Sequence, residues 1–215
     1  MGSQSFMGSR SGSRTALVIV DLQQDFCEGG ALPVEGGRDL AVRISDYVRA
    51  CRGDYVLVVT TRDWHEPDGT NGGHFAAPGT DPDFLHTWPV HCVQGTPGAA
   101  YVEEFAPLLD VVDAEILQGQ GDPGYSAFSG ATSDGHTLED LLAGVEADSV
   151  EVVGLATDYC VSATAVDAAA NPEREVAVLL DLCREVHSST ALAAVNRMLD
   201  AGVVIRYAIP LGADR

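Results

Sequence analysis

Continuous apolar runs alternate with segments of helical periodicity along most of the chain. Such runs are typical of strands buried on both faces, as in a parallel sheet. The sequence predicts six of these strands, at residues 15–20, 55–61, 113–117, 150–153, 175–181 and 203–207. Apolar residues spaced three or four apart predict helices at residues 39–49, 137–145, 161–170 and 188–201.

Strands that alternate with helices build a parallel sheet that is covered on both faces. We therefore predict an α/β fold, a three-layer α/β/α sandwich whose six-stranded, mostly parallel sheet has the Rossmann-like order 3-2-1-4-5-6. Ligands bind such sheets beyond the carboxyl ends of the strands, where the order reverses. Asp21 ends the first strand and residues 154–160 follow the fourth, its neighbour, so we expect a carboxylate and a thiol in one crevice.

The stretch at residues 154–160, GLATDYC, connects the fourth strand to the following helix. Thr157 and Asp158 are both favourable helix N-cap residues. Cys160 would then lie in the first helical turn, where the helix dipole favours the thiolate, the nucleophilic form of cysteine. The alternative, a buried structural cysteine, is equally compatible with this segment taken alone.

The length of 215 residues fits one domain with a sizeable core, which we place at residues 15–210. The Gly- and Ser-rich residues 1–14 are interpreted as a flexible leader or tag without the apolar core of a signal peptide. No apolar run reaches membrane-spanning length, so a cytoplasmic location and no membrane partner are expected. The five cysteines lack paired spacing and are expected to be reduced.

The net charge of -20 argues against a nucleic acid partner, because like charges repel a phosphate backbone. Two alternatives remain for this charge, a solvated acidic surface or a preference for a cationic ligand. All 12 basic residues are arginine, and the chain has no lysine.

One carboxylate and three imidazoles lie in or beside the long loop after the second strand: Asp63, His65, His74 and His91. Asp63 and His65 are two residues apart, so an extended backbone places them on one face. This donor set suits one divalent transition metal ion, zinc, iron or manganese. The alternative is a set of solvated loop histidines; His86 lies in the same stretch and is given no ligand role.

The chain resembles the nicotinamidase/pyrazinamidase family of isochorismatase-like cysteine hydrolases. The resemblance rests on the segments VIVDLQQDFCEGG, DWH with GGHF, TWPVHCVQGT, GYSAF and VVGLATDYCVSATA, and it runs from about residue 15 to residue 207. It implies a small-molecule amide substrate. It also allows a homo-oligomer, since family members are often dimers or larger.

The resemblance implies a mechanism in which Cys160 attacks the amide carbonyl. Asp21 takes the thiol proton and passes it to the departing ammonia, and water then hydrolyses the thioester. The backbone N–H groups of Ala156 and Cys160 would form the oxyanion hole, with a cis peptide bond between Leu155 and Ala156.

By the same resemblance, the metal is held by Asp63, His65, His74 and His91 and anchors the ring nitrogen of a pyridine-type substrate. The implied substrate-binding residues are Phe26, Trp88, Tyr125, Leu155, Ala156 and Tyr159. Plain core packing is the alternative for the aromatic members of this set.

The chain departs from the family at Gln118, where the third catalytic residue, a lysine, is expected seven residues before Tyr125. A glutamine donates neutral hydrogen bonds but carries no charge. Asp21 would then be a stronger base, or the thiol would be poorly activated. Tyr159, Gly121 and the long loop from Glu66 to Gly73 also depart from the expected pattern.

Three functions follow from these observations. The first is a metal-containing cysteine amidohydrolase that converts nicotinamide or a close heteroaromatic amide to its acid and ammonia. The second is hydrolysis of a different amide or lactam, such as a cationic antibiotic of the streptothricin type. The third is a catalytically impaired homologue that binds a small ligand.

Overall fold

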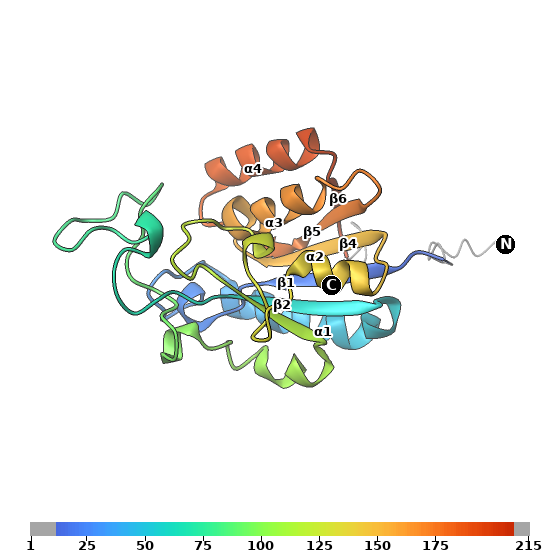
Figure 1. Ribbon diagram of the computed structural model, residues 1–215, viewed down its shortest axis with the longest axis horizontal. Coiled ribbons are helices and arrows are strands. Elements are labelled where there is room, and N and C mark those ends of the chain that lie inside the picture. The colour runs from blue at the N-terminus through green and yellow to red at the C-terminus, as the bar shows by residue number, and fades with distance from the viewer. Residues whose placement is uncertain (1–11, 209–215) are drawn as a thin grey trace.

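The structure, a computed structural model, describes residues 12–208 and centres on one parallel sheet (Figure 1). The strand order is β3-β2-β1-β4-β5-β6, and every neighbouring pair is parallel. The predicted fold class and strand order are confirmed. The strands are β1 Thr15–Val20, β2 Leu57–Asp63, β3 Ala114–Gln118, β4 Ser149–Leu155, β5 Glu175–Arg184 and β6 Val204–Arg206.

Alternate side chains of the central strands enter two separate hydrophobic cores. Leu17 and Ile19 of β1 pack on the side of α1, whereas Val18 and Val20 pack on the opposite side. Because both faces of β1 are apolar, the strand is a continuous apolar run rather than an alternating one. The helices are α1 Gly37–Cys51 on one face, and α2 Leu138–Gly144, α3 Ser162–Ala168 and α4 Ser188–Asp200 on the other.

The segment after β4 differs from the simple helix start that the sequence predicts. A π-helical turn, Thr157–Val161, precedes α3, and neither Thr157 nor Asp158 caps that helix. The Asp158 carboxylate instead accepts hydrogen bonds from the backbone N–H groups of Val186 and His187 and from the Thr190 hydroxyl. Asp158 therefore ties the turn that carries Cys160 to the start of α4.

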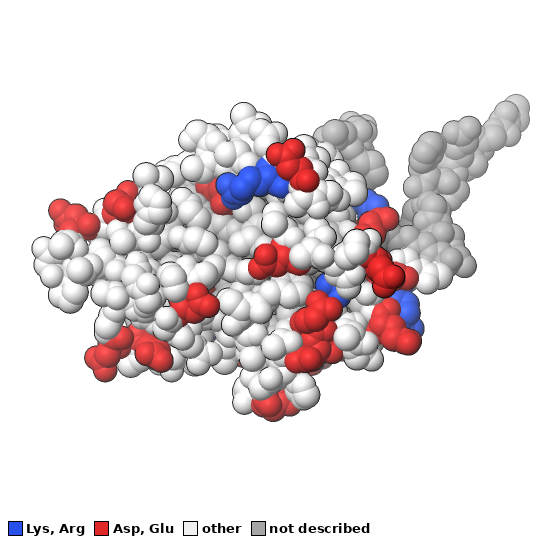
Figure 2. All heavy atoms as spheres, turned by 45° about the horizontal axis from the view of Figure 1, so that its top comes forward, with Lys and Arg blue, Asp and Glu red and all other residues white. Residues whose placement is uncertain are grey.

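The outer surface is strongly acidic. Carboxylates are spread across the face shown in Figure 2, with few arginines among them. Within residues 12–208, no helix combines the length and the apolar character that crossing a bilayer requires. Residues 1–11 of the predicted leader and the last two residues of the predicted domain lie outside the described range.

Candidate active site

Four predicted site residues lie at the carboxyl ends of four adjacent strands. Asp21 follows β1, Asp63 ends β2, Gln118 ends β3, and Cys160 lies just beyond β4. The parallel register of β2 and β3 pairs Asp63 with Gln118. The carboxylate oxygens of Asp21 and Asp63 and the Cys160 sulfur lie within 4.8 Å of one another. The structure thus brings the expected carboxylate and thiol together where the strand order reverses.

A strained backbone presents the Asp21 carboxylate to this crevice. Asp21 has φ 49°, a left-handed conformation that is rare for a residue with a side chain. Thr61 supports it, because its hydroxyl donates to the Asp21 carboxylate and accepts from the Asp21 N–H. A Cβ atom at Gly154 would lie 2.2 Å from the Val20 carbonyl oxygen, so only glycine allows β4 to approach β1 this closely.

Burial shifts the pKa of the thiol and the pKa of the carboxylate in the same direction, upward. Burial, followed by the charges of Asp21 and Asp63, raises the pKa of Cys160 well above its ordinary value. Burial, followed by the charge of Asp63, likewise raises the pKa of Asp21, although hydrogen bonds from Thr61 and Cys160 oppose this. The predicted stabilisation of the thiolate by the helix end is therefore outweighed.

The peptide bond between Leu155 and Ala156 is cis, as expected. The carbonyl oxygen of Ala156 accepts hydrogen bonds from the N–H groups of Tyr159 and Val161, which closes the π-helical turn around Cys160. The assignment of the Ala156 and Cys160 N–H groups to an oxyanion hole stays a prediction.

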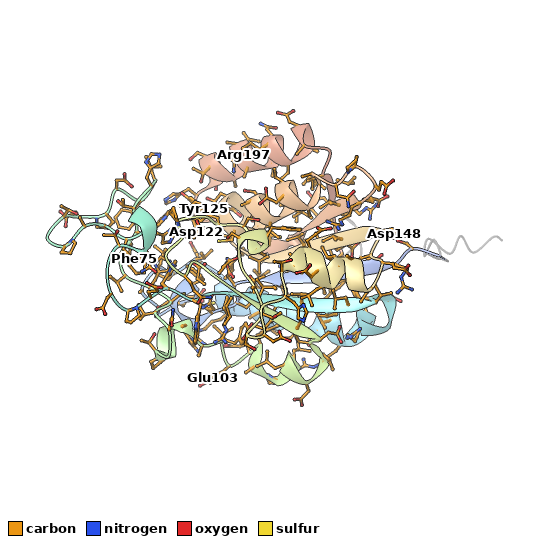
Figure 3. The ribbon with its side chains drawn as sticks, in the orientation of Figure 1. Phe75, Glu103, Asp122, Tyr125, Asp148 and Arg197 are labelled. Carbon is orange, nitrogen blue, oxygen red and sulfur yellow. The ribbon has the colours of Figure 1, made fainter. Side chains whose placement is uncertain are left out.

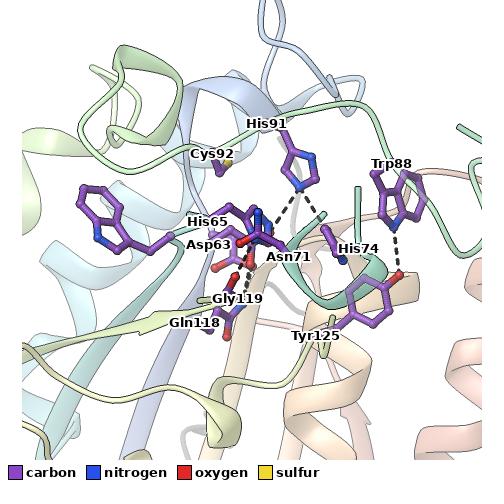
Figure 4. Close-up of polar contacts among 12 residues, drawn as sticks. Asp63, His65, Asn71, His74, Trp88, His91, Cys92, Gln118, Gly119 and Tyr125 are labelled. Atoms are coloured by element: carbon purple, nitrogen blue, oxygen red, sulfur yellow. Dashed lines mark hydrogen bonds and ion pairs between the residues drawn. The ribbon is translucent and has the colours of Figure 1, made fainter. Parts of the chain in front are cut away.

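Short backbone ladders fold the long loop after β2 so that its histidines meet. His65 pairs with the strand-like segment around Val93, through N–H···O bonds to Cys92 and from Gln94. A second ladder joins Phe75 to Trp88, because the Trp88 N–H donates to the His74 carbonyl. These two pairings bring His74 and His91 beside His65 although the loop contains few regular elements (Figure 4).

The four predicted metal ligands form one buried cluster. Asp63, His65, His74 and His91 each offer an atom, and these atoms lie within 4.8 Å of one another. Asp63 Oδ2 is 3.4 Å from His65 Nε2 and 3.6 Å from His91 Nε2. His86 is remote from this cluster; it is exposed and lies 3.5 Å from Asp83.

Backbone carbonyls set the protonation of two of the rings. His65 Nδ1 donates to the Gly119 carbonyl at 2.8 Å, and His91 Nδ1 donates to the Pro89 carbonyl at 2.7 Å. Each Nε2 is then left with a lone pair, the arrangement found in metal-binding histidines. His65 Nε2 is buried without a hydrogen-bond partner in the described structure. The donor set therefore fits a divalent metal ion.

The electrostatics of the cluster agree with this fit. Burial alone would raise the pKa of Asp63, but the His65 and His91 rings beside it outweigh burial and lower it. Burial lowers the pKa of His74 to about 4, so this ring is neutral at pH 7 and its lone pairs are available. Against the effect of burial, the Asp63 carboxylate raises the pKa of His65, so a bound cation would displace any proton that this ring carries.

A cavity opens beside the thiol and the histidine cluster. All the predicted substrate-binding residues line it: Phe26, Trp88, Tyr125, Leu155, Ala156 and Tyr159. Trp88 Nε1 donates to the Tyr125 hydroxyl at 2.9 Å, and the Tyr159 ring packs edge-on to Trp88 with centroids 5.0 Å apart. Figure 3 shows Phe75, Asp122 and Tyr125 at this end of the molecule and Asp148 at the other.

Sequence reasoning missed several residues that shape the site. Leu32, Val34 and Val186 complete the apolar lining of the cavity. Gln23 clamps the backbone of Asp63, because its side-chain amide both donates to the Asp63 carbonyl and accepts from the Asp63 N–H. These contacts join residues about forty positions apart, so no local pattern could have revealed them.

Gln118 is buried between the two carboxylates. Its Nε2 lies 3.1 Å from Asp21 Oδ2 and 3.2 Å from Asp63 Oδ1. The side chain supplies hydrogen bonds to both carboxylates without a charge.

The geometry can be compared with proteins of known family. Residues 15–208 match the model of the isochorismatase domain. The nicotinamidase/pyrazinamidase of Mycobacterium tuberculosis is 46% identical to this chain over 191 residues, which are 87% of this chain and 96% of that protein.

Two solved structures resemble the chain over most of its length. The PnC1 structure of L. infantum in complex with nicotinate is 33% identical, with a TM-score of 0.75, and the match covers 91% of this chain and 93% of that one. The pyrazinamidase of Pyrococcus horikoshii in complex with zinc is 34% identical, with a TM-score of 0.71, and the match covers 90% and 99%.

Proposed function

This chain belongs to the isochorismatase family and is an amidohydrolase that acts on C–N bonds other than peptide bonds, and on this premise we propose that it deamidates nicotinamide or a close heteroaromatic amide. The observation that carries the proposal is the buried Asp21–Cys160 pair, which lies beside both the histidine cluster and an aromatic cavity. No observation on the cavity favours a cationic lactam over a flat aromatic amide.

The pocket suits a small, flat substrate. Phe26 and Trp88 supply aromatic surfaces, and Tyr125 and Tyr159 narrow the cavity around them. Its lining is mainly apolar, with polar groups gathered at the thiol and at the histidines. A heteroaromatic ring would be held by the aromatic side chains, with its amide directed toward Cys160.

We infer that Asp63, His65, His74 and His91 hold one divalent cation, for which zinc is the first candidate. When bound, such an ion would supply a Lewis-acidic anchor for the ring nitrogen of the substrate. The chain's own residues then provide the covalent chemistry.

The proposed reaction begins with the neutral thiol. Cys160 transfers its proton to Asp21 as its sulfur bonds to the amide carbon. The N–H groups of Ala156 and Cys160 donate hydrogen bonds to the carbonyl oxygen, on which negative charge develops. Asp21 then returns the proton to the amide nitrogen, the C–N bond breaks, and ammonia leaves a thioester on Cys160.

The thioester is resolved by water. Asp21 takes a proton from the attacking water, the C–S bond breaks, and the carboxylic acid leaves as Cys160 regains its proton. Gln118 holds the Asp21 carboxylate in place throughout, through its Nε2 hydrogen bond. Burial and the charge of Asp63 raise the pKa of Asp21, which makes its carboxylate a stronger base than an exposed one.

Ammonia release from nicotinamide and from pyrazinamide by the purified, zinc-loaded protein tests the proposal. We expect turnover by the wild-type protein and none by Cys160→Ala. Hydrolysis that survives in Cys160→Ala would remove the thiol from the mechanism. If both amides are left intact while the protein still binds nicotinamide, the chain would be the impaired homologue.

A further inference from the structure

Two carboxylates meet at Gln118, which carries no charge, and Asp63 also faces His65 and His91. The Gln118 amide is 1% exposed and donates to Asp21 Oδ2 and Asp63 Oδ1, while its Oε1 atom is buried without a hydrogen-bond partner. Neutral donors offset the charge of buried carboxylates only in part. The site therefore attracts positive charge.

No arginine of the described chain neutralises the two carboxylates. Arg62 adjoins Asp63 in sequence but points the other way, with its guanidinium 2.8 Å from Glu115 and 4.4 Å above the Trp64 ring. Among residues 12–208, no arginine forms an ion pair with Asp21 or Asp63. The sequence contains no lysine.

The atoms around Gln118 form a donor set of their own. An oxygen of Asp21, an oxygen of Asp63 and the sulfur of Cys160 lie within 4.8 Å of one another. Asp63 faces two ways, because Oδ1 contacts Gln118 whereas Oδ2 faces His65 and His91. A half-turn of the Gln118 amide would add its unpartnered Oε1 as a fourth ligand.

We propose that Asp21, Asp63, Cys160 and Gln118 form a second divalent-cation site, selective for thiophilic ions such as Zn²⁺ and Cd²⁺. The Asp63 carboxylate would bridge this site to the histidine cluster, so the inference rests on the metal site of the proposed function. A cation bound here releases the thiol proton and holds both Cys160 and Asp21. Excess zinc therefore inhibits hydrolysis.

The number of zinc ions bound per full chain tests the second site. The protein is first stripped of metal with a chelator and then titrated with zinc. We expect about two zinc ions per wild-type chain. We expect about one per chain in Cys160→Ser, which removes a ligand, and about one in Gln118→Lys, which adds a cation. The control is Glu115→Gln, which changes a charge on the same strand but outside the pocket and keeps two. Thermal unfolding establishes that each variant is folded.

Cadmium provides a second readout. A cadmium–thiolate bond absorbs in the ultraviolet. In the wild type this absorption should grow as the second equivalent of cadmium is added, and in Cys160→Ser it should be absent. One zinc ion per wild-type chain at every excess would overturn the proposal, as would a second ion retained by Cys160→Ser or Gln118→Lys. These outcomes are independent of nicotinamide turnover, which is measured with one zinc ion bound.

Discussion

Gly119 is predicted to control the metal site although it offers no ligand. A Cβ atom at this position would lie 2.6 Å from Cε1 and 2.8 Å from Nδ1 of His65, and Gly119 has φ 79°. An ordinary contact begins at 3.4 Å, so Gly119→Ala pushes the imidazole away by about 0.8 Å. The same movement breaks the 2.8 Å hydrogen bond that orients the ring.

The expected loss can be sized from the contacts. Disturbing the group that orients a metal-binding histidine typically weakens metal affinity by about 10- to 100-fold, which is about 1.4 to 2.8 kcal/mol. An alanine at positive φ costs about 1 kcal/mol of folding stability in addition. Gly119→Ala should therefore lose zinc affinity and some thermal stability together.

Gly121→Ala is the matched control for this variant. Gly121 lies in the same loop with φ 74°, but a Cβ atom there would have no neighbour within 4 Å. Both variants should share the backbone cost, and only Gly119→Ala should lose zinc affinity in a chelator competition. Equal zinc affinities in the two variants would refute the reasoning, because the contact with His65 is the feature that separates them.

Three further predictions concern the pocket and two polar contacts that stabilise the fold. Tyr125→Phe removes the 2.9 Å hydrogen bond from Trp88, so KM for nicotinamide should rise a few-fold while kcat is kept. Asp158→Asn weakens the hydrogen bonds that tie the turn carrying Cys160 to the segment before α4, and the free energy of unfolding measured in urea should fall by about 1–2 kcal/mol. Glu139→Gln breaks the bidentate ion pair with the buried Arg174, so the protein should unfold at a lower urea concentration near pH 7.

The Glu139 prediction has a defined pH dependence. The hydrogen bond from Arg174 lowers the pKa of Glu139 in the folded protein. The stability from this pair is therefore present above the unfolded pKa, about 4.3, and is lost as the pH falls through the lower folded value. The difference in the free energy of unfolding between wild type and Glu139→Gln should shrink toward pH 3. A difference that stays constant with pH would contradict the stabilising role of the Glu139–Arg174 pair. For Tyr125→Phe, an unchanged KM would contradict the role of Tyr125 in the pocket. For Asp158→Asn, an unchanged urea midpoint would contradict the stabilising role of the Asp158 hydrogen bonds.

The sequence determined the sheet and much of the site's location. Apolar runs such as Thr15–Val20 identify buried strands because both faces of a covered parallel sheet exclude water. Asp21 and Cys160 follow strands that are adjacent in the observed order, so topology alone places them in one crevice. The apolar run places the second strand at residues 55–61, whereas β2 is Leu57–Asp63, because pairing with β3 extends it to Asp63.

Only the tertiary structure decided how these groups are held. The tautomers of His65 and His91 depend on carbonyls supplied by other parts of the chain, and the double contact of Gln118 depends on the register of β2 and β3. Burial holds Cys160 as a thiol, although its place near a helix start suggested a thiolate. Sequence spacing records which residues are near along the chain; desolvation and hydrogen bonding depend on which are near in space.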